Sequence, residues 1–521
     1  MKKIFFMATL ALLSMPLAAQ ETYENAKVST RDLNGTARYV GMGGAMEALG
    51  ADLSTISTNP AGIGLFRRSM FSLSAGIVSQ ADAPTFSSAN ATHVSFDQIG
   101  FVVAMKGEEG GFLNFGFNYH KSRNFDQILA AADRLYNASQ NKLTYAKQKN
   151  GLLFKTDTGT PNGIPDLNSP YNACNQLDDI YARNLNYDDQ QAMWFYDPAT
   201  AYNFGREHWG YVADYDFNIS GNINDRVFLG LTLGISDINY RHYSEYTENL
   251  VGPNGDYDLT VIDERRIDGT GVDIKAGVIF RPVEESPFRI GLSVVTPTWY
   301  DMTTSNYTQL TDGSIGPNNS ESYKFAMYTP WRFGLSLGHT IGTNLAIGAS
   351  YEFADYNTLD TRYKTDEYYD AWDGAYYSNS ESDREMNRNT HLMLKGVSTL
   401  KIGAEYKPVN DFAVRLGYNY VSPMYKDGGF KDGTIDSAGS YYSSATDFVN
   451  WKATNRITCG LGYNTNNWNF DVAYQYATQK GGFMPFMTYY DAVDESEDNV
   501  CDEVSVNNNR HQLLFTVGYR F

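Results

Sequence analysis

The chain has 521 residues, a formal net charge of −19 and a mean hydropathy of −0.42. The acidic balance argues against a nucleic-acid-binding protein, because such proteins neutralise phosphates with lysine and arginine. After residue 20, no stretch approaches the roughly eighteen uninterrupted apolar residues that a transmembrane helix needs.

The first nineteen residues have the order of a secretory signal peptide. Lys2 and Lys3 precede an apolar run that ends at Leu13, and small residues lead up to Gln20. The run is too short to cross a bilayer. We expect cleavage after Ala19 and a mature chain that begins at residue 20.

Residues 20–68 form a second segment, rich in glycine and weakly apolar. Asp52 is a candidate helix cap, and Asn59 followed by Pro60 is a second turn-then-helix start. Glycines at 41, 43, 44, 62 and 64 allow close backbone packing and positive φ. About fifty residues of this character are the right size for a plug inside a barrel.

From residue 69 to the end, apolar residues take one parity and polar residues the other, which is the period of a β-strand. In the last segment, Leu513, Phe515, Val517, Tyr519 and Phe521 alternate with more polar residues. The predicted strands are 69–79, 96–106, 112–121, 210–224, 226–241, 270–281, 287–297, 329–340, 344–356, 398–408, 411–422, 454–464, 467–477 and 510–521.

Every second connection is a tight turn, and the others run from about sixteen to nearly ninety residues. Short turns on one side, long loops on the other and an aromatic-rich apolar face are typical of an outer-membrane barrel. The 39 tyrosines suit the two lipid–water interfaces. The predicted fold is therefore all-β: a fourteen-stranded antiparallel transmembrane barrel over residues 69–521, with residues 20–68 as a lumenal hatch. We expect the N-terminus of the mature chain in the lumen or on the periplasmic side.

Charged residues of the strands share the parity that faces the lumen. A charge on the lipid face near the middle of the membrane would cost about 2–4 kcal/mol, which fixes the register. Both signs occur together with many glycines, so the interior is predicted to be occupied and not an open ion-selective pore. The residues are Asp214, Asp216, Asp273, Lys275, Arg289, Glu352, Arg456 and Asp471.

The largest insertion, residues 122–209, is predicted to be partly helical, with amphipathic stretches DQILAAADRLYN and NQLDDIYARNL. Two clusters of aromatic and methionine side chains lie in nominally exposed loops and need a partner. They either cover each other or hold a lipophilic ligand. The candidate ligand-binding residues are Met193, Trp194 and Phe195 in one cluster, and Phe483, Met484 and Phe486 in the other.

Cysteines and histidines suggest little chemistry. Cys174 and Cys501 fall in long loops and could pair, and Cys459 has the lipid parity. No spacing predicts a metal site, so we expect no metal and no cofactor. His120 has the lumen parity, and a single histidine can hold haem iron, which keeps a haem ligand as an alternative.

The chain resembles the FadL/TodX family of outer-membrane transporters for hydrophobic compounds. The matching runs are GMGGA from Gly41, NPAGIGL from Asn59, TLKIGAEYKP and GLSVVTP, so the resemblance extends over the mature chain. It implies a hatch that rearranges on substrate binding. The hatch or gating residues would be Gly41, Gly43, Gly44, Asn59, Pro60, Ala61 and Gly62.

The chain departs from that family in one respect: its largest insertion follows strand 3, whereas the family's capture loops follow strands 5 and 7. The position of the outer binding groove is therefore open. The family's lateral opening depends on a kink in strand 3, which Gly110, Gly111 and Gly116 would permit.

The resemblance predicts passive, ligand-gated uptake of small hydrophobic molecules, either long-chain fatty acids or aromatic compounds. The alternatives are a haem or porphyrin receptor and a non-transporting surface barrel such as an adhesin or antigen. An enzyme is not expected, because no motif assembles a serine, a histidine and an acid. The expected partners are a hydrophobic ligand, outer-membrane lipid, lipopolysaccharide and the barrel-assembly machinery, the last through the strand ending in Phe521.

Overall fold

The computed structural model describes residues 21–107, 111–150, 152, 175–188, 190–191, 193–314, 316–370, 372, 375–435 and 437–521. The predicted signal peptide, residues 1–19, and Cys174 lie outside the described residues. No helix among the described residues is long and apolar enough to cross a membrane.

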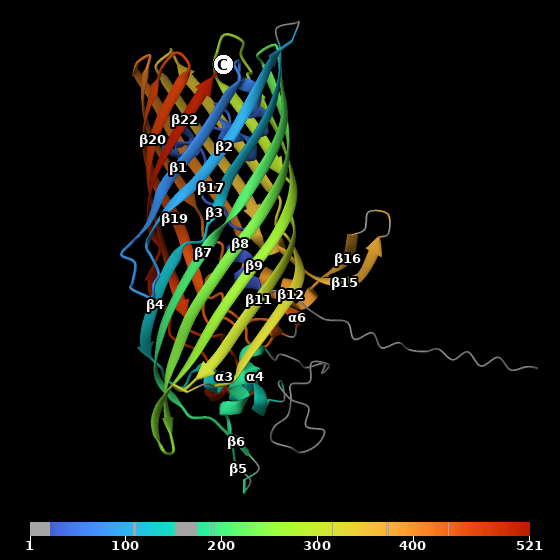
Figure 1. The fold of residues 1–521 in the computed structure, drawn as a ribbon, viewed down its shortest axis with the longest axis vertical. Coiled ribbons are helices and arrows are strands. Elements are labelled where there is room, and N and C mark those ends of the chain that lie inside the picture. The colour runs from blue at the N-terminus through green and yellow to red at the C-terminus, as the bar shows by residue number, and fades with distance from the viewer. Residues whose placement is uncertain are drawn as a thin grey trace, which may run out of the picture.

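Within the described residues, fourteen antiparallel strands close into a barrel, because β22 pairs with β1 (Figure 1). The predicted fold class is confirmed. The strands, in order around the wall, are β1 (Met70–Ala81), β2 (Thr92–Lys106), β3 (Phe112–Asn124), β7 (Ala199–Ile223), β8 (Val227–Gly252), β9 (Gly255–Phe280), β10 (Arg289–Val295), β13 (Arg332–Ile341), β14 (Leu345–Asp355), β17 (Gly396–Val409), β18 (Phe412–Val421), β19 (Phe448–Asn464), β20 (Trp468–Met484) and β22 (Asn509–Arg520).

Further strands extend the wall at the end where the long connections lie. β4 (Gln127–Arg134) pairs with β7, and β11 (Trp299–Thr311) pairs with β9 and with β12 (Asn318–Tyr328). β15 (Asp360–Asp370) and β16 (Ala375–Ser382) form a hairpin that leaves the barrel sideways (Figure 1). β21 (Val504–Asn507) pairs with β20, and the short hairpin of β5 (Asn186–Asp188) and β6 (Met193–Phe195) stands apart.

The outward face of β8 divides the barrel into two zones. From Leu229 to Ile235 the outward residues are apolar and 39–50% exposed. On the same face, Asp237, Asn239 and Arg241 then follow. Residues 227–235 are the first nine of β8. At about 3.3 Å each and tilted by about 40°, they rise roughly 23 Å, close to the roughly 25 Å of an outer-membrane apolar band. The remainder of β8 therefore lies beyond the lipid, with water on its outer face.

This second zone explains where the predicted strands were too short. The predicted strands begin at residue 210, end at residue 241 and begin at residue 270, whereas β7 begins at Ala199, β8 ends at Gly252 and β9 begins at Gly255. The apolar alternation stops where the lipid stops, but backbone pairing continues. The helix predicted at DQILAAADRLYN is wrong for the same reason: most of it is β4, paired with β7.

The described helices are short and lie in the hatch and in the outer connections. The hatch contains α1 (Thr22–Ser29), α2 (Ala37–Gly41), η1 (Leu53–Ser57) and η2 (Pro60–Leu65). The connections contain α3 (Gln140–Lys149), α4 (Gln176–Tyr181), η3 (Ala182–Asn184), η4 (Tyr356–Thr358), α5 (Arg384–Met393), α6 (Ala438–Tyr441) and η5 (Glu495–Glu497). α4 lies within the predicted stretch NQLDDIYARNL, and α3 and α4 lie at the end opposite Phe521 (Figure 1).

Glycines on the inner face of the wall make room for the hatch. A Cβ atom added at Gly348 would overlap the carbonyl of Ala45, and one added at Gly403 would overlap that of Met42. In both cases the obstacle is backbone, which cannot rotate away. The hatch therefore lies against the barrel with no space for one more methyl group at these positions.

We predict that Gly403→Ala displaces the hatch, because overpacking of this kind costs about 1–3 kcal/mol. Gly116→Ala is the matched control, since its Cβ would meet hatch side chains at an ordinary 3.4–3.5 Å. Limited proteolysis of residues 21–68 in folded, heat-modifiable barrels measures the displacement. Equal protection of the hatch in both variants would contradict the tight fit.

Candidate functional site

The hatch forms its short helices where the sequence supplies caps. The side chains of Thr36, Asp52 and Asn59 accept hydrogen bonds from backbone N–H groups at the starts of α2, η1 and η2. Pro60 follows Asn59 at the first helical position, where its missing N–H costs nothing. The helix starts predicted at Asp52 and Asn59 are both observed, with each side chain accepting a hydrogen bond from a backbone N–H.

Asn59 and Pro60, at the start of η2 in the hatch, are buried against the wall. A Cβ atom added at Gly277 would overlap Asn59, and one added at Gly230 would overlap Pro60. The side-chain Nδ2 of Asn59 has no hydrogen-bond partner in the described residues. Ala61 and Gly62 continue the same buried turn in η2. A gating role for these four residues stays a prediction.

The glycine run of the hatch lies against β17, β18 and β19. Gly43 and Gly44 have φ of +62° and +81°, which side chains with a Cβ adopt at a cost. A Cβ at Gly43 would also lie 2.8 Å from the backbone nitrogen of Tyr418. Gly41 lies against Gly460, 3.3 Å from the Cα atom by the same measure. The run is therefore required for close approach to the wall, whether or not it moves.

Ion pairs attach the hatch to the wall along its whole length. Arg38 pairs with Glu405 at 2.9 Å, Glu47 with Lys401 at 2.7 Å and Asp32 with Arg123 at 2.9 Å. Further pairs are Arg31 with Asp214 and Asp273, Asp32 with Arg456, Glu24 with Arg265, Glu21 with Lys431 and Arg67 with Asp225. The mixed charges predicted for the lumen thus serve in part to bind the hatch.

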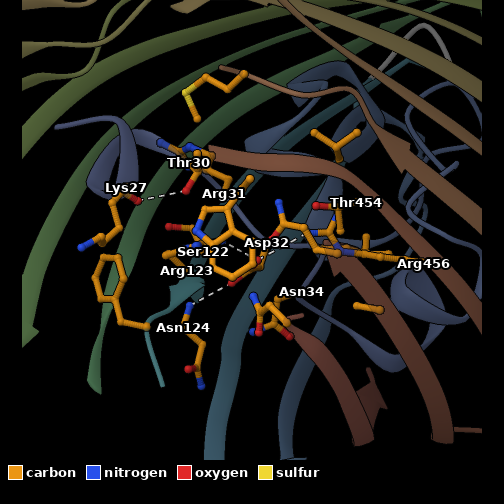
Figure 2. A pocket seen from close by; sticks show the side chains of 18 of the residues that line it. Lys27, Thr30, Arg31, Asp32, Asn34, Ser122, Arg123, Asn124, Thr454 and Arg456 are labelled. Carbon is orange, nitrogen blue, oxygen red and sulfur yellow. Dashed lines mark hydrogen bonds and ion pairs between the residues drawn. The ribbon is translucent and has the colours of Figure 1, made fainter. Parts of the chain in front are cut away.

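A cavity of about 260 Å³ remains between the hatch and the wall. Part of its lining is apolar and includes Tyr23, Phe125, Tyr425 and Phe448, which belong to one buried cluster. The other part is charged. Figure 2 shows Arg31, Asp32, Arg123 and Arg456 converging from the hatch, β3 and β19. Of the described residues that line the cavity, ten are lysine or arginine and five are acidic.

The cavity reaches a break in the barrel wall. In the described residues, the ladder between β2 and β3 stops at the Gln98–His120 pair, and beyond it β2 pairs with β1 only. We call the unpaired stretch, residues 92–97 facing residues 121–126, the seam. Asp97, Lys121 and residues 122–125 line the cavity as well. The seam is thus a part of the wall that backbone hydrogen bonds do not close.

Side chains close the seam instead. Asn34 of the hatch donates to Oδ1 of Asp97 and to the carbonyl of Lys121, both at 2.9 Å. Lys121 Nζ donates to Ser95 Oγ at 2.8 Å across the same gap. Farther along the seam, Nε2 of Gln80 on β1 donates to the carbonyl of Ile128 on β4, and Oε1 of Gln80 accepts from the Ile128 N–H, both at 2.7 Å. The hatch is therefore one of the elements that hold the seam shut.

The irregularity in the third strand of the wall, β3, does not lie at the glycines that the sequence suggested for a kink. Gly111 and Gly116 sit in the regular part of the β2–β3 connection and ladder, and Gly110 lies outside the described residues. Instead, β3 shifts its register against β7 between Lys121 and Arg123. A bulge needs no glycine, which is why residue type did not reveal it.

The two aromatic clusters of the loops are not brought together. Phe483, Met484 and Phe486 are buried, and Phe483 and Phe486 pack in a core that also contains residues of α3 and α4. Met193 and Phe195 are 48% and 38% exposed on the β5–β6 hairpin, and Trp194 packs on Tyr187. The core of α3, α4 and the last loop lies at the end of the barrel where the long connections are (Figure 1); we call it the cap.

His120, the histidine considered for haem, lies between two carboxylates. Its ring nitrogens are 3.8 Å from Asp214 Oδ2 and Asp216 Oδ2. In the described residues, no group of three or more histidine, cysteine, aspartate or glutamate side chains could hold a metal ion.

Sequence reasoning missed Asp32, Asn34, Arg123 and Arg510. The first two lie in a segment without periodicity, so nothing distinguished them from other polar residues. Arg123 lies past the register shift, where counting parity fails. Arg510 does carry a signal, because it shares the inward parity of Gln512 and Leu514.

Comparison with solved structures identifies the fold. A Pseudomonas aeruginosa FadL homologue matches with a TM-score of 0.53 at 12% identity, over 95% of this chain and 100% of that chain. The Ralstonia pickettii toluene transporter TbuX matches with a TM-score of 0.48 at 13% identity, over 94% of this chain and 99% of that chain. No family model and no curated protein matches the sequence.

The chain is thus a fourteen-stranded transmembrane β-barrel with an N-terminal segment inside it. More particularly, it has the fold of the FadL homologue, as the resemblance implied.

One buried carboxylate makes the cap sensitive to pH. Burial raises the pKa of Glu248, on the part of β8 beyond the lipid, from 4.5 to about 7. It accepts hydrogen bonds from the Tyr246 hydroxyl and from the N–H groups of Gln140 and Asn141 at the start of α3. Because the folded-state pKa is raised, stability present below pH 4.5 is lost as pH rises to about 7.

We predict that Glu248→Gln stabilises the cap at pH 8 and changes its stability little at pH 4.5. The neutral amide keeps an acceptor for Tyr246 and removes a penalty of at most about 3 kcal/mol. Thermal unfolding of the purified protein at both pH values measures the difference. A variant that is equally destabilised at pH 4.5 and pH 8 would show that Glu248 acts only through its hydrogen bonds to the start of α3, and not through its ionisation.

Proposed function

We propose that this protein is an outer-membrane channel for the passive, ligand-gated uptake of small hydrophobic molecules, with long-chain fatty acids or aromatic compounds as candidates. The observation that carries the proposal is the cavity between hatch and wall, which has an apolar side and reaches the seam. A water-filled pore does not help such solutes across lipopolysaccharide. A partly apolar chamber with an exit into lipid does.

In the proposed mechanism, the ligand enters when the cap opens, binds in the cavity and leaves through the seam. The hatch, held by ion pairs and by Asn34 at the seam, is the element that must shift. Asn59, Pro60, Ala61 and Gly62, with Gly41, Gly43 and Gly44, would anchor the hatch against the wall while residues 31–34 shift. No energy source enters this scheme, because binding and release follow the concentration gradient.

The location and partners belong to the proposal as well. The apolar band on the outward faces supports an outer-membrane position, with lipid and lipopolysaccharide around the barrel. α1 lies beside α5, and Glu21 pairs with Lys431 from the long connection after β18. The N-terminus of the mature chain, expected in the lumen or on the periplasmic side, would then lie in the lumen near the end where the long connections are. The last strand, ending in Phe521, would be the segment that the assembly machinery binds.

A non-transporting surface barrel is the second candidate, and the closed cap favours it. Phe483 and Phe486 are buried in a packed core over the mouth, and a barrel that stays closed in this way would serve as an adhesin or antigen. Uptake by proteoliposomes whose outer leaflet is lipopolysaccharide separates the two functions, because the test needs the barrier that the channel would overcome. The protein-dependent influx of radiolabelled oleate or toluene supports a channel, and no influx of either supports a surface barrel.

We predict that Val397→Trp lowers this influx at least several-fold, because the indole would fill part of the apolar side of the cavity. Ile402→Trp on the same strand is the control, since Ile402 faces lipid and is 47% exposed. Heat-modifiable mobility checks that both barrels assemble. If Val397→Trp conducts as well as the control, the cavity is not on the route.

We predict that joining the two sides of the seam blocks exit. Cysteines at Ser95 and Lys121, bridged by a short reducible dithiol cross-linker, should abolish influx, and reductant should restore it. The native cysteines are first replaced by serine. Cysteines at Ser305 and Ser322, which face each other across the continuous β11–β12 ladder, give the control bridge. Influx through the bridged seam would place the exit elsewhere.

A further inference from the structure

The β15–β16 hairpin joins the wall close to the outer boundary of the apolar band. Tyr328, at the end of β12, pairs with Asp360 at the start of β15. From Tyr328 the chain continues almost directly to Trp331 and Phe333, which are exposed on the outward face of the wall. Phe353, an exposed outward residue of β14, precedes β15 by one short turn, η4. The hairpin therefore begins near the level at which the lipid ends.

Beyond its base, the hairpin leaves the wall. β15 pairs with β12 only from Asp360 to Tyr363, and further along it pairs with β16. From Tyr363 to Asp370, strand residues at about 3.3 Å each reach up to roughly 23 Å. Figure 1 shows this part rising toward the end of the barrel where the C-terminus is marked. That end carries the apolar band, so the hairpin extends beside the barrel toward the lipid.

Polar contacts at the base fix the direction of the hairpin. Arg362 donates from Nη1 to Asp360 Oδ2 and from Nη2 to the carbonyl of Ser380, both at 2.7 Å. These bonds join the two strands of the hairpin. Lys364 Nζ donates to Asp301 Oδ2 on β11, also at 2.7 Å. The base is therefore tied to the extended wall, and the tip is held away from it.

The stem of the hairpin is polar, whereas its tip is aromatic. Residues 364–367 and 378–382 are all polar or charged, and the run between them, 368–377, reads YYDAWDGAYY. Tyr368 and Tyr369 are 52% and 56% exposed, and Trp372 is 96% exposed. A cluster of large exposed side chains of this kind marks an interaction surface.

The composition of the tip suits a lipid–water interface. Tyrosine and tryptophan are enriched there, because their rings are apolar while the hydroxyl or the indole N–H stays hydrated. Successive strand residues such as Tyr368 and Tyr369 point to opposite faces, so aromatic side chains leave the hairpin on both sides. A lipid surface can surround such a tip. The two aspartates of the run also fit, since the cost of a carboxylate becomes small near the interface.

We propose that the β15–β16 hairpin is an interfacial anchor, whose aromatic tip lies in the headgroup region of the outer leaflet beside the barrel. This inference rests on the outer-membrane position proposed above and adds a lipid contact outside the barrel wall. Because the tip lies away from the wall, its contact has a long lever arm. The hairpin therefore limits tilting of the barrel and fixes its depth in the membrane.

The test measures the depth of the tip by electron paramagnetic resonance, on the full barrel in nanodiscs of phosphatidylcholine and phosphatidylglycerol. The native cysteines are replaced by serine, and Tyr369→Cys carries one nitroxide label. Oxygen concentrates in lipid and a nickel chelate stays in water, so the ratio of their collision rates reports depth. We expect a ratio several-fold above that of labelled Tyr136→Cys and below that of labelled Leu335→Cys. Tyr136 is exposed between β4 and α3, and Leu335 faces lipid.

Removal of the central aromatic side chain tests the anchor itself. Trp372→Ser should lower the ratio at position 369 to that of labelled Tyr136→Cys. Trp331→Ser is the matched control, since Trp331 is also exposed but lies beside the wall just before β13, and it should leave the ratio unchanged.

Three results would overturn the inference. The first is a ratio at position 369 equal to that at position 136, and the second is an unchanged ratio in Trp372→Ser. The third is a label that becomes immobile only when lipopolysaccharide is added, without a higher ratio, which would assign the tip to sugar chains. A water-like ratio at position 335 would overturn the membrane position as well, so the two failures are distinguishable.

Discussion

Lipid around the barrel is the constraint on which the rest of this structure depends. It requires an apolar outward face from each strand, and so every charge within the band must face inward. An inward charge without water or a partner is costly, and the hatch supplies the partners. Arg38 with Glu405 and Glu47 with Lys401 are examples. The lipid thus indirectly selects a filled lumen, and the filled lumen needs glycines in the wall.

The hatch is packed tightly against the wall in one part and is held by polar contacts in another. The tightly packed part fixes its position, and the part with polar contacts can move. Around Asn59 and Gly43 it touches the wall through backbone and glycine, which leaves no freedom. Around Asp32 and Asn34 it is held by polar side chains at the border of a cavity. Polar contacts can be exchanged for those of a ligand or water, whereas close packing cannot. Movement is therefore expected at residues 31–34 and not in the turn that carries the family resemblance.

The outer face of the barrel meets lipid along one part of its length and water along the other. Within the lipid, the solvation of side chains requires apolar residues to alternate with inward polar ones. Beyond the lipid, the same strands continue with water on their outer face and the core of the cap on their inner face. Leu229 and Arg241 share one face of one strand and meet different surroundings. This explains how a chain with a low mean hydropathy builds a membrane protein. It also explains why the cap, which packs as a soluble core, can respond to pH through Glu248.

The strands inside the lipid, their register and the inward charges could be predicted from the sequence, because period-two alternation is a local property that lipid enforces. The glycine-rich segment before the first strand likewise predicted a hatch. The sequence also identified the caps at Asp52 and Asn59. The three-dimensional structure was needed to find the length of β7, β8 and β9, the strand at 127–134, the seam, the contacts of Asp32 with Arg123 and Arg456, and the place of Arg510 in the same cavity. These features depend on which segments lie side by side across the barrel. No local pattern encodes that, since residues far apart in sequence become partners only when the wall closes.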